Sequence, residues 1–230
     1  MTKYTTLLLD ADETLLDFKF AEHFAIKTVC EKHGIPFDDT VAACYSKINQ
    51  NLWEMLEKGL VTRDQIKLRR FEEFAAVQKS NANPQDMAQD YILALSSCGK
   101  TLEGADKLLL DLSQKYRLYI VTNGITFVQE RRLAASGLLP YFNDIFISEK
   151  FGSAKPKREF FEKIFALIPE KDLSKMCIIG DSLSSDIQGG INAGIDTCYL
   201  SKNTENLAVC PTYTAKDYTQ IREIFLYETQ

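Results

Sequence analysis

The chain has 230 residues, of which 45% are apolar, 11% aromatic and 26% charged. This composition is typical of a globular protein, and the length corresponds to about one and a half domains at ~150 residues each. The formal net charge of −5 argues against non-specific binding to nucleic acids or anionic membranes, although it does not exclude a small anionic substrate.

The six cysteines are scattered, with no C-x-x-C pair and no metal-type spacing to either histidine. The apolar run near the N-terminus has only three leucines before Asp10, which is too short for a secretory signal. No segment approaches the ~18 apolar residues of a membrane span. We therefore expect a cytoplasmic protein with reduced thiols and no membrane partner.

Continuous apolar runs predict strands that are buried on both faces of a parallel sheet. The first run is Thr5 to Leu9, and it ends abruptly at Asp10. Further runs of this kind cover residues 117–121, 144–147, 176–179 and 197–200. Helical patterns cover residues 105–116, 126–136 and 158–168, and a tail helix is expected at 218–227. The alternation of strands and helices predicts an α/β fold with a Rossmann-like parallel sheet.

Residues 16–98 do not follow this alternation of strands and helices, because they contain four helical segments and no convincing strand. The sequence from Thr62 to Gln65 has the form of a capping box, and Asn83-Pro84 begins the last helix with proline at its first position. We interpret 16–98 as an inserted all-helical cap domain. The α/β core then comprises residues 1–15 and 99–230.

Each strong strand of the core is followed by polar residues. These are Asp10 to Thr14, Thr122 to Gly124, Lys155-Pro156 and Gly180 to Asp186. Ligands of open α/β sheets bind at the carboxyl ends of the strands, so the four clusters are expected to converge on one site.

The converging carboxylates are Asp10, Asp12, Asp181 and Asp186. Crowded like charges are unfavourable, and a hard divalent cation with oxygen ligands, such as Mg²⁺, would relieve the repulsion. Lys155, the Thr122 hydroxyl and a turn with backbone N–H groups would suit a phosphoryl group. Taken singly, each aspartate could equally be a helix cap or turn residue, and Lys155 a solvated side chain.

The motifs DADETL, VTNG, AKP and GDSLSSD together resemble the four motifs of the haloacid dehalogenase superfamily, in its phosphatase branch. The resemblance covers nearly the whole chain, including the helical cap. Residues 48–53 and 70–72 in the cap and 189–194 in the core are similar to those of the YjjG-like pyrimidine 5′-nucleotidases. One departure is Glu13, where most such phosphatases carry glycine.

The resemblance implies an aspartyl-phosphate mechanism that depends on Mg²⁺. Asp10 would be the nucleophile, and Asp12 would act as general acid and then as general base. The metal would be held by the Asp10 carboxylate, the Asp12 backbone carbonyl and Asp181.

Thr122 and the Asn123 N–H would bind phosphoryl oxygens, and Lys155 would stabilise charge in the transition state. Asp186 would orient Lys155 or a metal-bound water, and Thr14 would brace the loop through a hydroxyl bond. The substrate would be a small phosphorylated metabolite, with UMP, dUMP and dTMP as the favoured nucleotides.

The cap is expected to set specificity, with Asn49, Trp53 and Arg70 as candidates. Each of these residues could instead have a purely structural role. Trp53 could be a core residue, and Asn49 and Arg70 could belong to a solvated helix face. Glu13 could point outward or could contact the substrate. The sequence decides neither this question nor the oligomeric state.

Other functions remain open. A phosphatase of phosphoglycolate or of a sugar phosphate would use the same motifs, and a phosphomutase would differ in its cap. A haloacid dehalogenase would lack the second acidic residue, which is present here as Asp12. A non-catalytic nucleotide-binding module would be expected to have lost motif residues, and none is missing.

Overall fold

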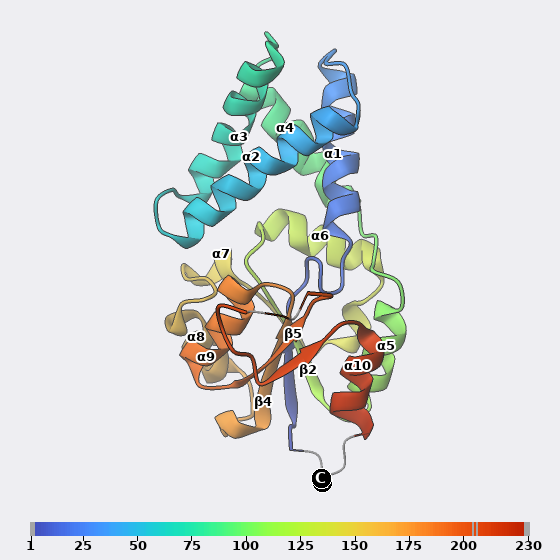
Figure 1. Ribbon diagram of the computed structural model, residues 1–230, viewed down its shortest axis with the longest axis vertical. Helices are drawn as coiled ribbons and strands as arrows, with labels where there is room; N and C mark the ends of the chain where they lie inside the picture. The colour runs from blue at the N-terminus through green and yellow to red at the C-terminus, as the bar shows by residue number, and fades with distance from the viewer. Residues whose placement is uncertain (1–2, 204, 206, 228–230) are drawn as a thin grey trace. The chain divides into compact units, whose positions relative to one another are not determined.

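The computed structural model describes residues 3–203, 205 and 207–227. In this part of the chain, six parallel strands form one sheet in the order β3-β2-β1-β4-β5-β6. Figure 1 shows the ribbon, with β2, β4 and β5 of this sheet labelled. The strands are β1 (Thr6–Leu9), β2 (Arg117–Thr122), β3 (Asp144–Ile147), β4 (Met176–Gly180), β5 (Asp196–Leu200) and β6 (Tyr213–Ala215). The predicted α/β fold with a parallel sheet is confirmed. The chain moves outward from β1 to β2 and β3, and β4 then pairs on the other side of β1.

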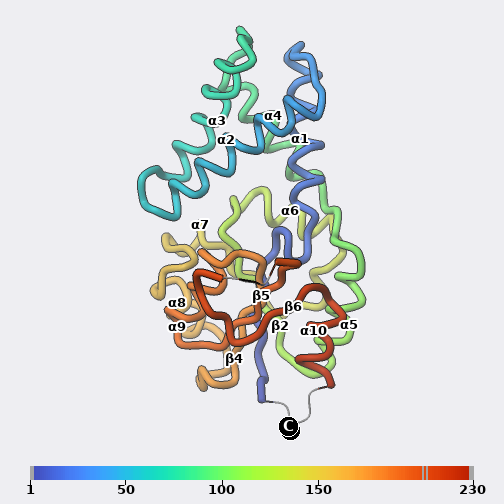
Figure 2. Tube along the Cα trace, viewed as in Figure 1, coloured from blue at the N-terminus to red at the C-terminus, as the bar shows by residue number. Residues whose placement is uncertain are grey.

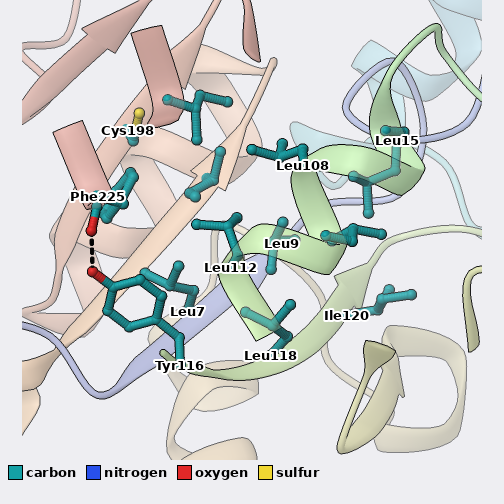
Figure 3. Packing of buried hydrophobic residues seen from close by; sticks show 14 of the residues in the cluster. Leu7, Leu9, Leu15, Leu108, Leu112, Tyr116, Leu118, Ile120, Cys198 and Phe225 are labelled. Atoms are coloured by element: carbon teal, nitrogen blue, oxygen red, sulfur yellow. Dashed lines mark hydrogen bonds between the residues drawn. The ribbon is translucent and has the colours of Figure 1, made fainter. Parts of the chain in front are cut away.

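The central strand β1 is buried throughout and consists of three leucines after Thr6, because both of its faces are covered. Successive strand residues point to opposite sides of a sheet. Leu7 and Leu9 belong to one buried cluster with Leu112 and Phe225 (Figure 3). Leu8 belongs to a second cluster with Phe161. The sequence pattern of this strand therefore reflects two hydrophobic layers.

Helices of the core unit supply these layers. The first cluster includes residues of α5 (Ala105–Ser113), of α10 (Tyr218–Arg222) and of the π-helical turn Glu223–Tyr227. The second includes residues of α8 (Arg158–Leu167) and α9 (Gln188–Ala193). The remaining α-helices of this unit are α6 (Thr126–Ser136) and the short α7 (Ser148–Phe151).

The chain divides into two compact units, residues 1–17 with 99–230 and residues 18–98. The first boundary lies two residues beyond the predicted one. Leu15 and Leu16 are fully buried in the same cluster as β1, and Leu16 forms an isolated bridge with Thr101. Burial of these two leucines therefore assigns them to the sheet-containing unit.

The second unit consists of α1 (Phe18–Lys32), α2 (Asp39–Glu57), α3 (Arg63–Gln78) and α4 (Pro84–Ser97). Helix α1 packs against α4, and α2 packs against α3. The predicted capping box is confirmed, with the Thr62 and Gln65 side chains each bonded to the other's backbone N–H. Pro84 begins α4 as expected.

The edge strand β6, labelled in Figure 2, is absent from the sequence prediction. It has only three residues, and one of them is exposed. The tail helix is also less regular than predicted, since α10 continues as a π-helical turn. All six cysteines are free thiols, and Cys177 and Cys198 are buried. Among the described residues, no helix is both long and apolar enough to cross a membrane.

Candidate active site

The predicted polar clusters meet where the carboxyl ends of β1, β2 and β4 lie side by side. Asp10 follows β1, Thr122 ends β2, and Asp181 follows β4. Strand β1 lies between β2 and β4, so the order of the sheet reverses next to Asp10. A reversal of this kind opens a crevice at the strand ends, which is where α/β proteins bind their ligands.

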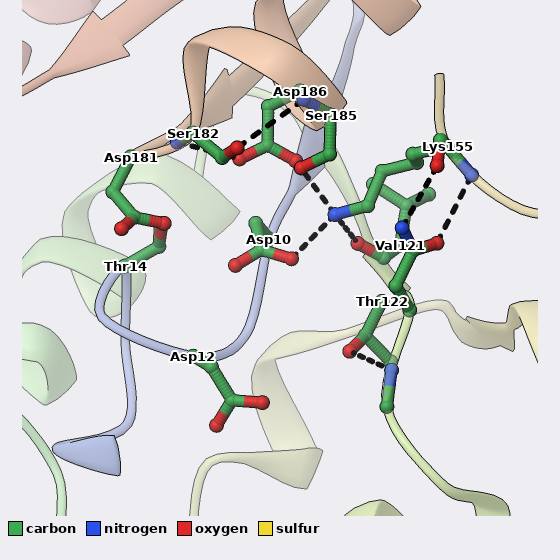
Figure 4. Close-up of polar contacts among 12 residues, drawn as sticks. Asp10, Asp12, Thr14, Val121, Thr122, Lys155, Asp181, Ser182, Ser185 and Asp186 are labelled. Atoms are coloured by element: carbon green, nitrogen blue, oxygen red, sulfur yellow. Dashed lines mark hydrogen bonds and ion pairs between the residues drawn. The ribbon is translucent and has the colours of Figure 1, made fainter. Parts of the chain in front are cut away.

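Lys155 lies at the centre of this site and is almost fully buried. Its Nζ contacts Asp10 Oδ1 and donates to the Val121 carbonyl at 2.7 Å and to Asp186 Oδ1 at 2.6 Å (Figure 4). Three acceptors match the three N–H bonds of an ammonium group. The lysine is therefore held by two carboxylates and by the end of β2.

The backbone of Lys155 is fixed by Asn123. The Asn123 Nδ2 donates to the Lys155 carbonyl at 2.9 Å, and the Lys155 N–H donates to Asn123 Oδ1 at 3.0 Å. This reciprocal pair joins the turn after β2 to the segment after α7. The sequence assigned Asn123 to phosphate binding through its N–H, and the structure adds a positioning contact by its side chain.

Asp186 is buried beside Lys155, and Gly180 provides the space for it. Its Oδ2 accepts a hydrogen bond from the Ser182 N–H at 3.0 Å. A Cβ atom at Gly180 would lie 2.2 Å from Asp186 Oδ2, so any larger residue there would displace this carboxylate. The last residue of β4 thus makes room for the lysine's partner.

The electrostatics of the site are dominated by burial. Desolvation disfavours the charged form of Lys155, but the attraction of Asp10 and Asp186 outweighs it and raises the pKa of the lysine. Burial raises the pKa of Asp10 well above its usual range, Lys155 opposes this rise, and the neighbouring carboxylates add to it. Burial and the charge of Asp186 raise the pKa of Asp181 to about 7.

Among the described residues, Asp10, Asp181 and Asp186 form a group whose carboxylate oxygens lie within 4.8 Å of one another. Asp10 and Asp181 have raised pKa values, and Asp186 is paired with Lys155. A hard cation would be stabilised among such crowded carboxylates. An all-oxygen donor set of this kind fits Mg²⁺. Thr14 is buried beside the group and donates to Asp181 Oδ1 at 3.4 Å.

Asp12 does not join this carboxylate group, although it lies only two residues after Asp10. Its Oδ1 contacts Arg132, and its Oδ2 accepts a hydrogen bond from Gln129 Nε2 at 2.9 Å. Neither partner is predicted from the sequence. The available signal was their spacing of three residues on α6, on the helix face that carries Val128 and Leu133.

Glu13 adopts a left-handed backbone conformation with φ of 56°. This conformation favours glycine, which is the residue that the family resemblance leads us to expect here. The departure noted in the sequence is therefore one of local backbone strain.

We predict that Glu13→Gly is more stable than Glu13→Ala by about 1 kcal/mol, because both remove the side chain but only glycine relieves the left-handed strain. Urea unfolding of the two variants measures the difference directly. Equal free energies of unfolding, or a more stable alanine variant, would contradict the strain at this position.

The specificity candidates of the helical unit are arranged differently from the sequence expectation of a solvated face. Asn49 and Arg70 are buried, and Arg70 Nη1 donates to Asn49 Oδ1 at 3.2 Å. Asn49 Nδ2 in turn donates to Glu22 Oε1 at 2.7 Å, and the Arg70 guanidinium lies 4.4 Å from the ring centroid of Tyr91. Trp53 is partly buried and packs against the cluster of Leu52, Val61 and Ile66.

A parallel sheet whose order reverses beside buried carboxylates and a buried lysine is an α/β fold with a candidate ligand site at its strand ends. The family is shown by comparison with known proteins. Residues 4–194 match the family model described as haloacid dehalogenase-like hydrolase. The chain belongs to this family, as the sequence motifs predict, and is therefore a hydrolase.

Similar proteins extend over the full chain. The Bacillus subtilis HAD-hydrolase YfnB, whose crystal structure was solved with bound magnesium, superposes with a TM-score of 0.92 at 38% identity over 97% of this chain and 99% of YfnB. Pyrimidine 5′-nucleotidase PynA of Streptococcus pneumoniae is 40% identical over 95% of this chain and 93% of its own length. Pyrimidine 5′-nucleotidase YjjG of Escherichia coli is 30% identical over 96% and 98%.

Proposed function

We propose that this protein is a Mg²⁺-dependent phosphomonoesterase that hydrolyses pyrimidine nucleoside 5′-monophosphates, such as UMP, dUMP or dTMP, through an aspartyl-phosphate on Asp10. The observation that carries the proposal is the setting of Asp10. One of its oxygens contacts Lys155, and the other points away from the lysine (Figure 4). A buried carboxylate held in this way is oriented for attack by its second oxygen.

In the first step, Asp10 attacks phosphorus, and the bond from phosphorus to the ester oxygen breaks. Asp12 donates its proton to the departing nucleoside oxygen. In the second step, a water oxygen attacks phosphorus, the bond to Asp10 breaks, and Asp12 takes the proton from the water. Inorganic phosphate and the nucleoside leave, and Asp10 and Asp12 return to their starting states.

Lys155 and Thr122 act on the phosphoryl oxygens in this scheme. Lys155 supplies a fixed positive charge beside the nucleophile, and Thr122 supplies a hydroxyl at the end of β2. Asp186 keeps the lysine in place through its 2.6 Å contact, and the Asn123 side chain fixes the lysine backbone.

Mg²⁺ would be held by the carboxylates of Asp10 and Asp181 and by the backbone carbonyl of Asp12. When bound, the ion supplies positive charge where an anionic nucleophile meets an anionic phosphate. The three clustered carboxylates and the magnesium in the YfnB structure support this assignment.

The pyrimidine preference rests on PynA and YjjG, both named as pyrimidine 5′-nucleotidases and similar over nearly the whole chain. For base selection we propose Asn49, Trp53 and Arg70. In the described part of the chain, Nε and Nη2 of the buried Arg70 have no hydrogen-bond partner, which leaves donors of the kind that base carbonyl oxygens accept.

The test is phosphate release from a panel containing UMP, dUMP, dTMP, purine nucleotides, phosphoglycolate and a hexose phosphate, with and without EDTA. We expect the pyrimidine nucleotides to give the highest kcat/KM, EDTA to abolish turnover, and added Mg²⁺ to restore it. Activity that survives chelation would contradict the metal dependence. A strong preference for phosphoglycolate or the sugar phosphate would contradict only the nucleotidase assignment.

A further inference from the structure

We propose that Gln129 and Arg132, both on α6, are positioning residues that hold the acid/base carboxylate of Asp12 in register with the phosphate-binding Thr122. This inference rests on the proposed function, because it assigns these residues a role through Asp12. Neither residue would contact the reacting atoms.

Both oxygens of Asp12 are bound from one helix. Arg132 Nη1 contacts Asp12 Oδ1, and Gln129 Nε2 donates to Asp12 Oδ2 at 2.9 Å. Arg132 Nη1 also lies 3.3 Å from Gln129 Oε1, so the two helix residues orient each other. Hydrogen bonds to both oxygens restrict the rotation of this carboxylate. Each oxygen keeps a second lone pair that can accept the transferred proton.

The burial of these groups indicates a function beyond packing. The Arg132 side chain is 0% exposed, whereas the Asp12 carboxylate that it binds is 30% exposed. A buried guanidinium is costly, and an apolar side chain of similar volume often stabilises a protein core as well or better. Here the buried charge is directed at a carboxylate that remains partly open to solvent.

Gln129 connects Asp12 to Thr122. Its Nε2 donates to Thr122 Oγ1 at 2.8 Å as well as to Asp12, and the Gly124 N–H donates to the same hydroxyl at 3.2 Å. Because Oγ1 accepts these two hydrogen bonds, the hydroxyl hydrogen of Thr122 is left to act as a donor, which is what a phosphoryl oxygen requires. A Cβ atom at Gly124 would lie 2.5 Å from the Gln129 side chain, so this glycine admits the glutamine.

The test compares two substrates in Arg132→Met and Gln129→Met, with Asp12→Asn as the reference. A nucleoside 5′-monophosphate needs a proton on its leaving oxygen, whereas p-nitrophenyl phosphate releases a stable anion that needs none. Hydrolysis of the aspartyl-phosphate needs the base in both cases. Misplacing Asp12 therefore slows both steps for the nucleotide but only the second for the nitrophenyl ester.

For Arg132→Met we expect kcat on the nucleotide to fall about 100-fold, with KM changed by less than about threefold. With p-nitrophenyl phosphate, we expect a rapid burst of one nitrophenol per enzyme before a slow steady state, as for Asp12→Asn. Gln129→Met should show the same pattern with a loss of about 10-fold. Arg132→Lys, which keeps a charged donor, should recover part of the lost rate.

Arg131→Met is the matched control, because Arg131 is the exposed neighbour on the same helix, and it should behave as the wild type. A fold check by thermal unfolding accompanies each variant, and Gln129→Met carries the test if Arg132→Met does not fold. Equal losses on both substrates without a burst, or a rise confined to KM, would overturn the inference. A wild type that releases no phosphate from either substrate would instead overturn the proposed function.

Discussion

Replacing Asp10 by asparagine is expected to lower kcat by roughly 10⁴-fold or more, because an amide cannot form the aspartyl-phosphate. The variant should nonetheless fold. Burial and the neighbouring carboxylates raise the pKa of Asp10, so the neutral amide is tolerated where the charged group is disfavoured. Phosphate release and the midpoint of thermal unfolding, measured without metal, together check both statements.

Asp17→Asn is the matched control for this experiment, since Asp17 pairs with Lys100 at 3.1 Å near the surface. It should leave turnover unchanged. Acid quenching during turnover should trap a phosphoryl group on the wild type and none on Asp10→Asn. Retention of more than about 1% of the activity by Asp10→Asn would contradict the nucleophilic role.

Replacing Lys155 by methionine should destabilise the metal-free protein by about 3–5 kcal/mol at pH 8, because it leaves buried carboxylates without their cation. The attraction of Lys155 lowers the pKa of Asp10, so its removal lets that pKa rise further. A folded carboxyl with a raised pKa keeps a proton that the unfolded chain releases, and stability therefore falls as pH rises. The loss in free energy of unfolding caused by Lys155→Met should therefore be smaller at pH 5 than at pH 8.

The stability of the wild type also falls as pH rises, but by a smaller amount. The pKa of Asp181 is raised to about 7, so without metal the wild type also loses stability between about pH 4 and 7. The comparison must therefore be made between variants at each pH. Lys157→Met, at an exposed position, should change the free energy of unfolding by less than about 0.5 kcal/mol. A Lys155→Met deficit that is equal at both pH values would contradict the electrostatic explanation.

The sequence predicts the sheet well because its central strands must be apolar on both faces. Leu7, Leu8 and Leu9 must fill layers on both faces, which leaves a continuous apolar run that is hard to mistake. The polar residues at the strand ends are visible for the related reason that each interrupts such a run abruptly. Strand β6 escapes prediction because an edge strand of three residues needs no such run.

The polar contacts of four buried residues are not predicted from the sequence, for a different reason. Gln129 and Arg132 occupy interior positions of an ordinary helix, and only tertiary structure reveals that their partner is Asp12. Asn49 and Arg70 are misread as a solvated face because polar residues are usually exposed. Pairing between buried polar groups far apart in sequence leaves no periodic signal.

The junction between the two units has a consequence for how this protein can change. The chain leaves the core after Asp17 and returns at Gly99, and the departing and returning segments are hydrogen-bonded neighbours, with the Asp17 N–H donating to the Lys100 carbonyl and the Leu102 N–H to the Leu15 carbonyl. These hydrogen bonds hold the two ends of the inserted unit side by side on the sheet-containing unit. We expect an insert of another length or sequence to be accepted at this point without a shift in the strand register, because insertions are tolerated best where their two ends already lie close together. Under the proposed function, the reacting groups would belong to one unit and base selection to the other, so that the two could vary separately.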